Sequence, residues 1–188
     1  FPYTTLFRST NLQISSRYTD PSIRHYLTKY GFLPPWVLNN ILTMGNISKL
    51  YSVMKPLDRQ QISREFGIQD NLLENFLLYL TDVRNISAHG NRLYCMRSKR
   101  PLVDTNVHVN LPILRGPGEY KYGKRDLFAA FVALKYLTSN NDSERLVDEI
   151  NAILDELRPH LQTITIADIK AEMGLPEDWW KIRWRNVK

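Results

Sequence analysis

The segment 84–92 places a permanent cation and a titratable imidazole close together in the chain. Arg84 is always charged and can hold a phosphate with two donors. His89 changes its protonation state near neutral pH, and histidine is the commonest general acid or base. A phosphate holder beside a proton carrier is what RNA cleavage without a metal ion requires. The same residue types are also favoured near a helix C-terminus by the helix dipole, so a purely structural role is the alternative.

The spacing of these residues limits how one chain can use them. On an ideal helix, five positions separate two side chains by roughly 140° around the axis and about 7.5 Å along it. Arg84 and His89 therefore share a face only if the helix ends or distorts near His89, and Gly90 is a candidate for that end. Asn85 lies four residues before His89 and could orient its imidazole. Arg92 could add a second phosphate contact.

A long amphipathic helix positions this segment. Apolar residues recur at helical spacing before the motif and predict a central helix capped by Asp70, with one buried face made by Leu72, Leu73, Phe76, Leu77, Leu80 and Val83. Caps, prolines and glycines predict further helices at 21–30, 36–43, 47–54, 59–66, 127–138, 144–157 and from 166 onward. The sequence therefore predicts an all-α bundle.

Residues 96–125 differ in texture from the rest of the chain. Prolines, glycines and basic residues predict a long basic loop, with room for a short strand at 107–111 or a hairpin. Basic side chains interleaved with tyrosines could form a groove in which RNA bases stack. The candidate RNA-binding residues are Arg97, Lys99, Arg100, Arg115, Lys121 and Lys124. A solvated insertion without a ligand is the alternative.

Composition excludes several classes of protein. The chain has 188 residues, 43% of them hydrophobic, which is enough for a proper core, and a net charge of +6 suits a polyanionic partner. The single cysteine, Cys95, rules out an internal disulfide and a cysteine-based zinc site and favours the cytoplasm. The four histidines lack metal-ligand spacing, so we expect neither a metal nor a cofactor. Neither a signal peptide nor a membrane span is visible.

Five segments, one of which contains the motif, carry a family resemblance. In chain order they are Pro35-Trp36-Val37, Met44–Tyr51 (MGNISKLY), Ile62–Gly67 (ISREFG), Val83–His89 (VRNISAH) with Asn91-Arg92-Leu93, and Met173–Trp179 (MGLPEDW). Over 36–180 the chain resembles the Abi-like (AbiD/AbiF-type) phage-resistance family, whose C-terminal half is a HEPN helical domain with an Arg-x4-His motif.

The resemblance implies a metal-independent endoribonuclease with Arg84 and His89 as the catalytic pair. The family pattern often has a second His where this chain has Gly90. Many HEPN proteins join two motifs across a homodimer, which would supply two proton-transfer groups for transesterification through the ribose 2′-OH. The alternatives are an RNA-binding module for a guide or regulatory RNA, without cleavage, and a protein-interaction scaffold.

The first nine residues, FPYTTLFRS, match the translation of a common sequencing adapter. We interpret residues 1–9 as an adapter artefact and exclude them from fold reasoning. Residues 10–188 are then predicted to form a single HEPN-like helical domain, the C-terminal part of a longer protein.

Overall fold

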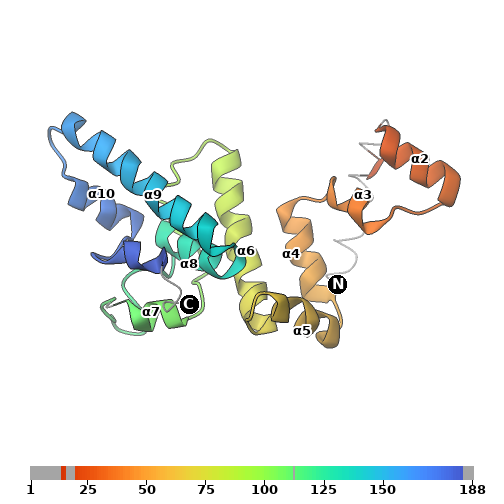
Figure 1. Ribbon diagram of the computed structural model, residues 1–188, viewed down its shortest axis with the longest axis horizontal. Coiled ribbons are helices and arrows are strands. Elements are labelled where there is room, and N and C mark those ends of the chain that lie inside the picture. Colours follow the sequence, from red (N-terminus) through yellow and green to blue (C-terminus); the bar gives the residue numbers. More distant parts are fainter. Residues whose placement is uncertain (1–13, 16–19, 112, 184–188) are drawn as a thin grey trace. The chain divides into compact units, whose positions relative to one another are not determined.

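The computed structural model describes residues 14–15, 20–111 and 113–183, and its regular elements are helices (Figure 1). They are α2 (Pro21–Tyr30), α3 (Pro35–Asn39), α4 (Met44–Val53), α5 (Pro56–Glu65), α6 (Asp70–Ala88), α7 (Asn106–Asn110), α8 (Leu127–Leu137), α9 (Asn140–Leu157), η1 (Arg158–His160), α10 (Ile166–Met173) and η2 (Trp179–Arg183). Within these residues no strand forms, which confirms the predicted all-α class. The chain divides into two compact units, 1–61 and 62–188.

The first unit has a small aliphatic core. Asp20 caps α2 by accepting from the Ser22 backbone N–H at 2.8 Å, and Pro21 occupies the first turn, where no helical N–H partner is needed. A buried cluster joins α2 to the following segment. It consists of Ile23, Val37 and Ile41, whose side chains are each at most 6% exposed and pack together. Aliphatic side chains therefore fill this core.

The second unit is built on the packing of α6, α8, α9 and η2 (Figure 1). The helix α8 is buried on nearly all sides, as its almost continuous apolar sequence predicts. Phe76 of α6 packs on Tyr136 of α8 with ring centroids 5.4 Å apart, and Phe131 of α8 packs on Trp179 of η2 at 5.9 Å. Trp179 is a packing residue, because its side chain is completely buried.

One polar contact fixes α6 against the start of α8. The Tyr79 hydroxyl of α6 donates to the backbone carbonyl of Asp126 at 2.8 Å, and burial raises the pKa of Tyr79. Asp126 in turn caps α8, accepting from the Ala129 backbone N–H at 3.1 Å. The central helix and the buried helix are therefore joined through both ring packing and a buried hydrogen bond.

Several predicted helix starts were wrong by three or four residues, because hydroxyl caps and proline act earlier than expected. Thr43 caps α4, which begins at Met44 and not at residue 47, and Ser139 caps α9, which begins at Asn140 and not at residue 144. Pro56 begins α5, and Asp70 is the first residue of α6 with Gln69 at the cap. Helix α3 ends at Asn39, four residues earlier than predicted.

The predicted strand at 107–111 was also wrong. Residues Asn106–Asn110 form the one-turn helix α7, whose Val107 is buried while Val109 is 71% exposed. A hydroxyl–imidazole capping box between Thr105 and His108 stabilises this turn and overrides the apolar alternation. The single-domain interpretation of 10–188 stays a prediction, and residues 1–9 lie outside the described part of the chain.

A substitution at Gly174 tests whether the end of α10 packs closely against the start of α8. Its φ is +74°, and a methyl group there would overlap the Asp126 carboxyl group. We expect Gly174→Ala to lower the free energy of unfolding by about 2–5 kcal/mol, the sum of left-handed strain and overpacking. Urea denaturation measures this loss.

Gly67→Ala is the matched control for Gly174→Ala. Gly67 has a φ of +66° but open space around the added methyl group, so only the backbone strain of about 1–2 kcal/mol applies. Equal losses in the two variants would contradict the close packing of Gly174 on Asp126.

Candidate functional site

The motif occupies the last turn of α6, and its residues alternate between the core and the solvent. Val83 and Ile86 pack against the core of the second unit. Arg84 and His89 are exposed. Because Phe76 and Tyr79 anchor the preceding turns of the same helix, packing determines which way the exposed motif residues face.

The helix ends immediately after the motif in a Schellman turn. The Gly90 N–H donates to the Ser87 carbonyl at 3.3 Å, and the Asn91 N–H donates to the Ile86 carbonyl at 3.2 Å. Gly90 adopts a φ of +67°, which a side chain would disfavour. The prediction that Gly90 ends this helix is confirmed, and glycine is the residue type that this turn prefers.

Because α6 continues to Ala88, Arg84 and His89 lie on different faces of the helix. The backbone stays helical through Ala88, and the His89 N–H still donates to the Asn85 carbonyl at 3.1 Å. His89 therefore continues the same spiral, and the roughly 140° separation of an ideal helix applies. Helix geometry within one chain does not direct both side chains at one phosphate.

Both motif side chains are available to a ligand. Among the described residues, neither the Arg84 guanidinium nor the His89 imidazole has a hydrogen bond or an ion pair. Asn85 and Arg92 are also exposed. Over this same part of the chain, Asn85 contacts His89 through the backbone, and the orienting role of its side chain stays a prediction.

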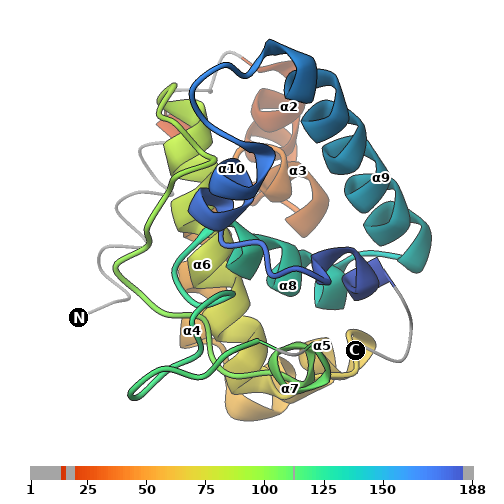
Figure 2. The same cartoon turned by 90° about the vertical axis from the view of Figure 1, so that its left-hand side faces the viewer.

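The loop after the motif runs back along α6 towards α7 (Figure 2). Ser98 contacts the Asp82 carboxylate at 3.3 Å, and the Asn75 side chain binds Pro101 and Val103 through their backbone groups. Three polar contacts along one helix thus hold the chain in an extended path. This segment carries the predicted residues Arg97, Lys99 and Arg100, which are all exposed, with Arg97 in an ion pair to Glu172 at 3.2 Å.

A tight hairpin carries two more of the predicted residues. Arg115 and Tyr120 form an isolated antiparallel bridge, closed by a 2.9 Å hydrogen bond from the Gly116 N–H to the Glu119 carbonyl. The Arg115 guanidinium lies 5.3 Å from the Tyr120 ring, and the Lys121 ammonium lies 5.0 Å from the Tyr122 ring. The hairpin alternative for this loop is therefore what the structure contains, and its cations lie over its own tyrosine rings. The stacking of RNA bases on these tyrosines stays a prediction.

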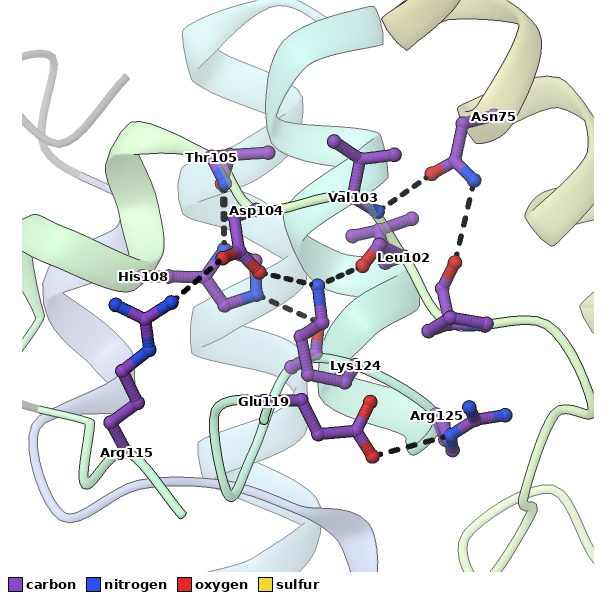
Figure 3. A network of polar contacts seen from close by, with 12 residues as sticks. Asn75, Leu102, Val103, Asp104, Thr105, His108, Arg115, Glu119, Lys124 and Arg125 are labelled. Atoms are coloured by element: carbon purple, nitrogen blue, oxygen red, sulfur yellow. Dashed lines mark hydrogen bonds and ion pairs between the residues drawn. The ribbon is translucent and has the colours of Figure 1, made fainter. Parts of the chain in front are cut away.

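Lys124 is a correction to the predicted RNA-binding set. Its side chain is buried, and its ammonium donates to the Leu102 carbonyl and, at 2.6 Å, to the Asp104 carboxylate (Figure 3). The hydrogen bond from Lys124 holds the pKa of Asp104 below its usual range. An ammonium committed to a buried carbonyl and a carboxylate stabilises the loop and does not face a phosphate.

His108 lies in the same network, as a neutral imidazole (Figure 3). Its Nδ1 accepts from the Thr105 backbone N–H at 3.1 Å, so the other nitrogen carries the hydrogen and donates to the Gly123 carbonyl at 2.9 Å. Burial lowers the pKa of His108, and burial raises the pKa of Asp126 to about 6. The sequence did not indicate this network, because no spacing rule links a one-turn helix to a loop 15 residues later.

A pocket of about 400 Å³ lies elsewhere in the second unit. It is lined by Arg64, Gly67, Ile68, Gln69, Leu72, Asp104, Thr105, Asn106 and Tyr136. None of the predicted motif or RNA-binding residues lines it. Leu72 and His89 are 17 residues apart on α6, or roughly 25 Å at the helical rise, so this pocket is separate from the motif.

The described residues lack the features of two other kinds of site. They contain no group of three or more His, Cys, Asp and Glu side chains arranged to hold a metal ion. In the same residues, no helix combines the length and apolar character needed to cross a membrane.

A family model matches the first half of the chain. Residues 3–95, which include the complete motif, match the family described as Abi-like protein. No curated protein and no solved structure matches the chain significantly.

The buried His108 predicts a pH-dependent stability. Its folded-state pKa lies below the ordinary value of 6.5, so only the unfolded state takes up this proton just below pH 6.5, and acid destabilises the fold. We expect the stability difference between wild type and His108→Gln to fall from pH 7.5 to pH 5.5, by at most about 1.4 kcal/mol per pH unit. Urea denaturation at each pH measures it.

Asp126 has the opposite effect on stability, because its raised pKa favours the folded state as the pH falls below about 6. Both proteins contain Asp126, so its effect cancels in the difference between the unfolding free energies of wild type and His108→Gln. His160→Gln is the matched control, because His160 is exposed and its curve should run parallel to wild type. Parallel curves for His108→Gln and wild type would contradict a buried neutral imidazole.

Proposed function

This chain belongs to the Abi-like protein family, which residues 3–95 match, and we propose that it acts as the nuclease of an abortive-infection system. The family indicates a role in defence against phage. Within that role, we propose a metal-independent endoribonuclease of HEPN type that works as a cytoplasmic homodimer. Arg84 and His89 are the proposed catalytic residues.

The observation that carries this proposal is the state of the motif at the end of α6. Arg84 and His89 are exposed on a helix that Phe76 and Tyr79 anchor in the core. A charged group and an imidazole held at the surface by a packed helix are already positioned for a substrate, which lowers the cost of ordering them on binding. A purely structural role would instead favour contacts with neighbouring side chains.

The proposed reaction is transesterification at a phosphodiester. His89 removes the proton from a ribose 2′-OH, and the resulting oxygen forms a bond to the adjacent phosphorus. Arg84, together with Arg92, stabilises the negative charge that develops on the phosphoryl oxygens. The bond from phosphorus to the 5′-oxygen breaks, and His89 of the partner subunit supplies a proton to that oxygen. The products are a 2′,3′-cyclic phosphate and a free 5′-OH.

The geometry of α6 supports a site made by two chains. One chain offers a single motif histidine, and its Arg84 and His89 project roughly 140° apart around the helix. The reaction needs one group that accepts a proton and one that donates it. A twofold arrangement that brings the two helix ends together supplies both.

A second candidate function is RNA binding without cleavage. Gly90 occupies the place of the family's second histidine, which lowers the number of proton-transfer groups. The exposed cations Lys99, Arg100 and Arg115 suit a guide or regulatory RNA as well as a substrate.

Cleavage in the presence of a chelator separates these two functions. We expect the purified wild-type chain to cut mixed RNAs in EDTA and to leave 5′-OH ends that a polynucleotide kinase can label. Arg84→Ala and His89→Ala should each lower the rate about 10²- to 10⁴-fold, because each removes charge stabilisation or proton transfer. The labelled ends are the measurement.

The matched controls for these two variants are Arg145→Ala and His160→Ala, which remove the same residue types from exposed sites on other elements. Both should cleave at the wild-type rate. RNA binding by wild type without any cleavage would favour the binding module over the nuclease.

Mixing experiments test the shared site. If both His89 side chains serve one site, wild-type chains paired with His89→Ala chains are inactive. At constant wild-type concentration, an equal amount of His89→Ala should halve the cleavage rate, and a ninefold excess should leave about a tenth, by random pairing of two chains. His160→Ala chains, added in the same amounts, should raise the rate. No inhibition by His89→Ala, under conditions where subunits exchange, would place the whole site in one chain.

A further inference from the structure

The first unit carries a group of aromatic side chains on its surface, which we call the aromatic surface: His25, Tyr26, Tyr30, Phe32 and Trp36. Three of these rings are well exposed, with 49% of Tyr30, 61% of Phe32 and 66% of Trp36 accessible. Exposed aromatic side chains that touch one another form a contiguous apolar patch, which is typical of an interaction site.

Local structure brings these rings together. Tyr26 and Tyr30 are one helical turn apart on α2, and their ring centroids are 5.8 Å apart. Gly31 then ends α2 with a φ of +73°, and the chain turns so that Phe32 lies 6.4 Å from Tyr30. Trp36, at the start of α3, meets Tyr26 edge-on at 6.5 Å.

Tyr26 packs against the small core of this unit, whereas Tyr30, Phe32 and Trp36 remain outside it. Ile23, Val37 and Ile41 fill the interior between α2 and α3. The large faces of Phe32 and Trp36 therefore remain in contact with water, at a cost in hydrophobic free energy that folding does not recover.

The segment of the chain that carries these rings is basic. Residues 21–57 contain Arg24, Lys29, Lys49 and Lys55 and not one Asp or Glu. On α2, a depression of about 420 Å³ is lined by Pro21, Arg24, His25, Thr28 and Lys29. His25 belongs both to this depression and to the aromatic surface, and the Lys29 ammonium lies 5.3 Å from the Tyr30 ring. The cations and the rings thus form one continuous surface.

We propose that the aromatic surface binds single-stranded RNA, with unpaired bases stacked on Tyr30, Phe32 and Trp36 and phosphates held by Arg24 and Lys29. Aromatic faces beside a cationic depression are what proteins use to bind single strands, because every base offers a face for stacking and the backbone is uniformly charged. A stretch of 37 residues without a carboxylate suits a polyanion better than a typical protein partner, which carries both signs of charge.

This inference deepens the proposed function, since it rests on RNA as the ligand, but it assigns binding to a surface other than the motif. Paired bases hide their faces in the stack. The surface should therefore prefer single strands to duplexes.

A non-cleavable probe tests the inference independently of catalysis. Fluorescein-labelled 2′-O-methyl oligouridylate of 15 nucleotides lacks the 2′-OH that transesterification requires, so anisotropy with the full wild-type chain reports binding alone. We expect Trp36→Ala to raise Kd about 5- to 100-fold, and Tyr30→Ala combined with Trp36→Ala to raise it further. Trp36→Phe keeps an aromatic face and should stay within about twofold of wild type.

The matched control for Trp36→Ala is Leu57→Ala. Leu57 is an equally exposed apolar side chain of the same unit, 73% accessible and outside the aromatic surface, and its loss should leave Kd unchanged. Arg24→Gln and Lys29→Gln should each reduce the slope of log Kd against log salt by about 0.7, whereas Lys55→Gln, outside the depression, should not. Circular dichroism melting shows that each variant folds.

Four outcomes overturn the inference: no binding of the probe by wild type, unchanged binding by the Tyr30→Ala and Trp36→Ala double variant, equal affinity for a duplex of the same backbone, or self-association of the chain that Trp36→Ala abolishes while RNA binding persists. The nuclease proposal is judged separately. Loss of cleavage in His89→Ala with unchanged probe binding supports both proposals, and absence of cleavage with Trp36-dependent probe binding removes only the nuclease.

Discussion

The contact between α6 and α8 is the constraint on which the second unit depends. Phe76 and Tyr79 bury one face of α6 against α8, and the Tyr79 hydroxyl bonds to the backbone of Asp126. Two large side chains and a buried hydrogen bond on one face of a helix determine its rotation about its own axis. Because the helix is rigid, the rotation set in its middle also decides which residues of its last turn face the solvent. Arg84 and His89 owe their exposure to this packing.

The basic loop shows how backbone satisfaction competes with ligand binding. An irregular segment that packs on a helix must find partners for its own carbonyl and N–H groups. The Asn75 side chain supplies two of them from α6, and Lys124 supplies another from the loop itself. A lysine that serves a buried carbonyl is no longer part of the exposed positive charge. Lysines that are close in sequence can therefore have different roles: one stabilises the loop, whereas others remain exposed to a ligand. Only the contacts in the folded structure distinguish them.

In the first unit, large apolar side chains lie on the surface. The core around α2 and α3 is small and aliphatic, so the large side chains of Tyr30, Phe32 and Trp36 remain exposed. Sequence reasoning used Trp36 only as part of a family resemblance and missed the aromatic surface. The available signal was the absence of acidic residues from 21–57 together with four aromatic residues within eleven positions, 26–36.

The sequence by itself determined what depends on neighbours in the chain: the all-α class, the long helix before the motif, its end at Gly90 and the burial of α8. Periodicity and glycine geometry act over a few residues, so a linear pattern contains them. Tertiary structure decided the rest. His108 meets Gly123, and Lys124 meets Asp104, only because the loop folds back on α6. The capping box of Thr105 and His108 likewise prevailed over an apolar alternation that is typical of a strand. Such contacts join groups that are distant in sequence. Their free energy decides between local conformations such as helix and strand, and no local pattern of residues contains it.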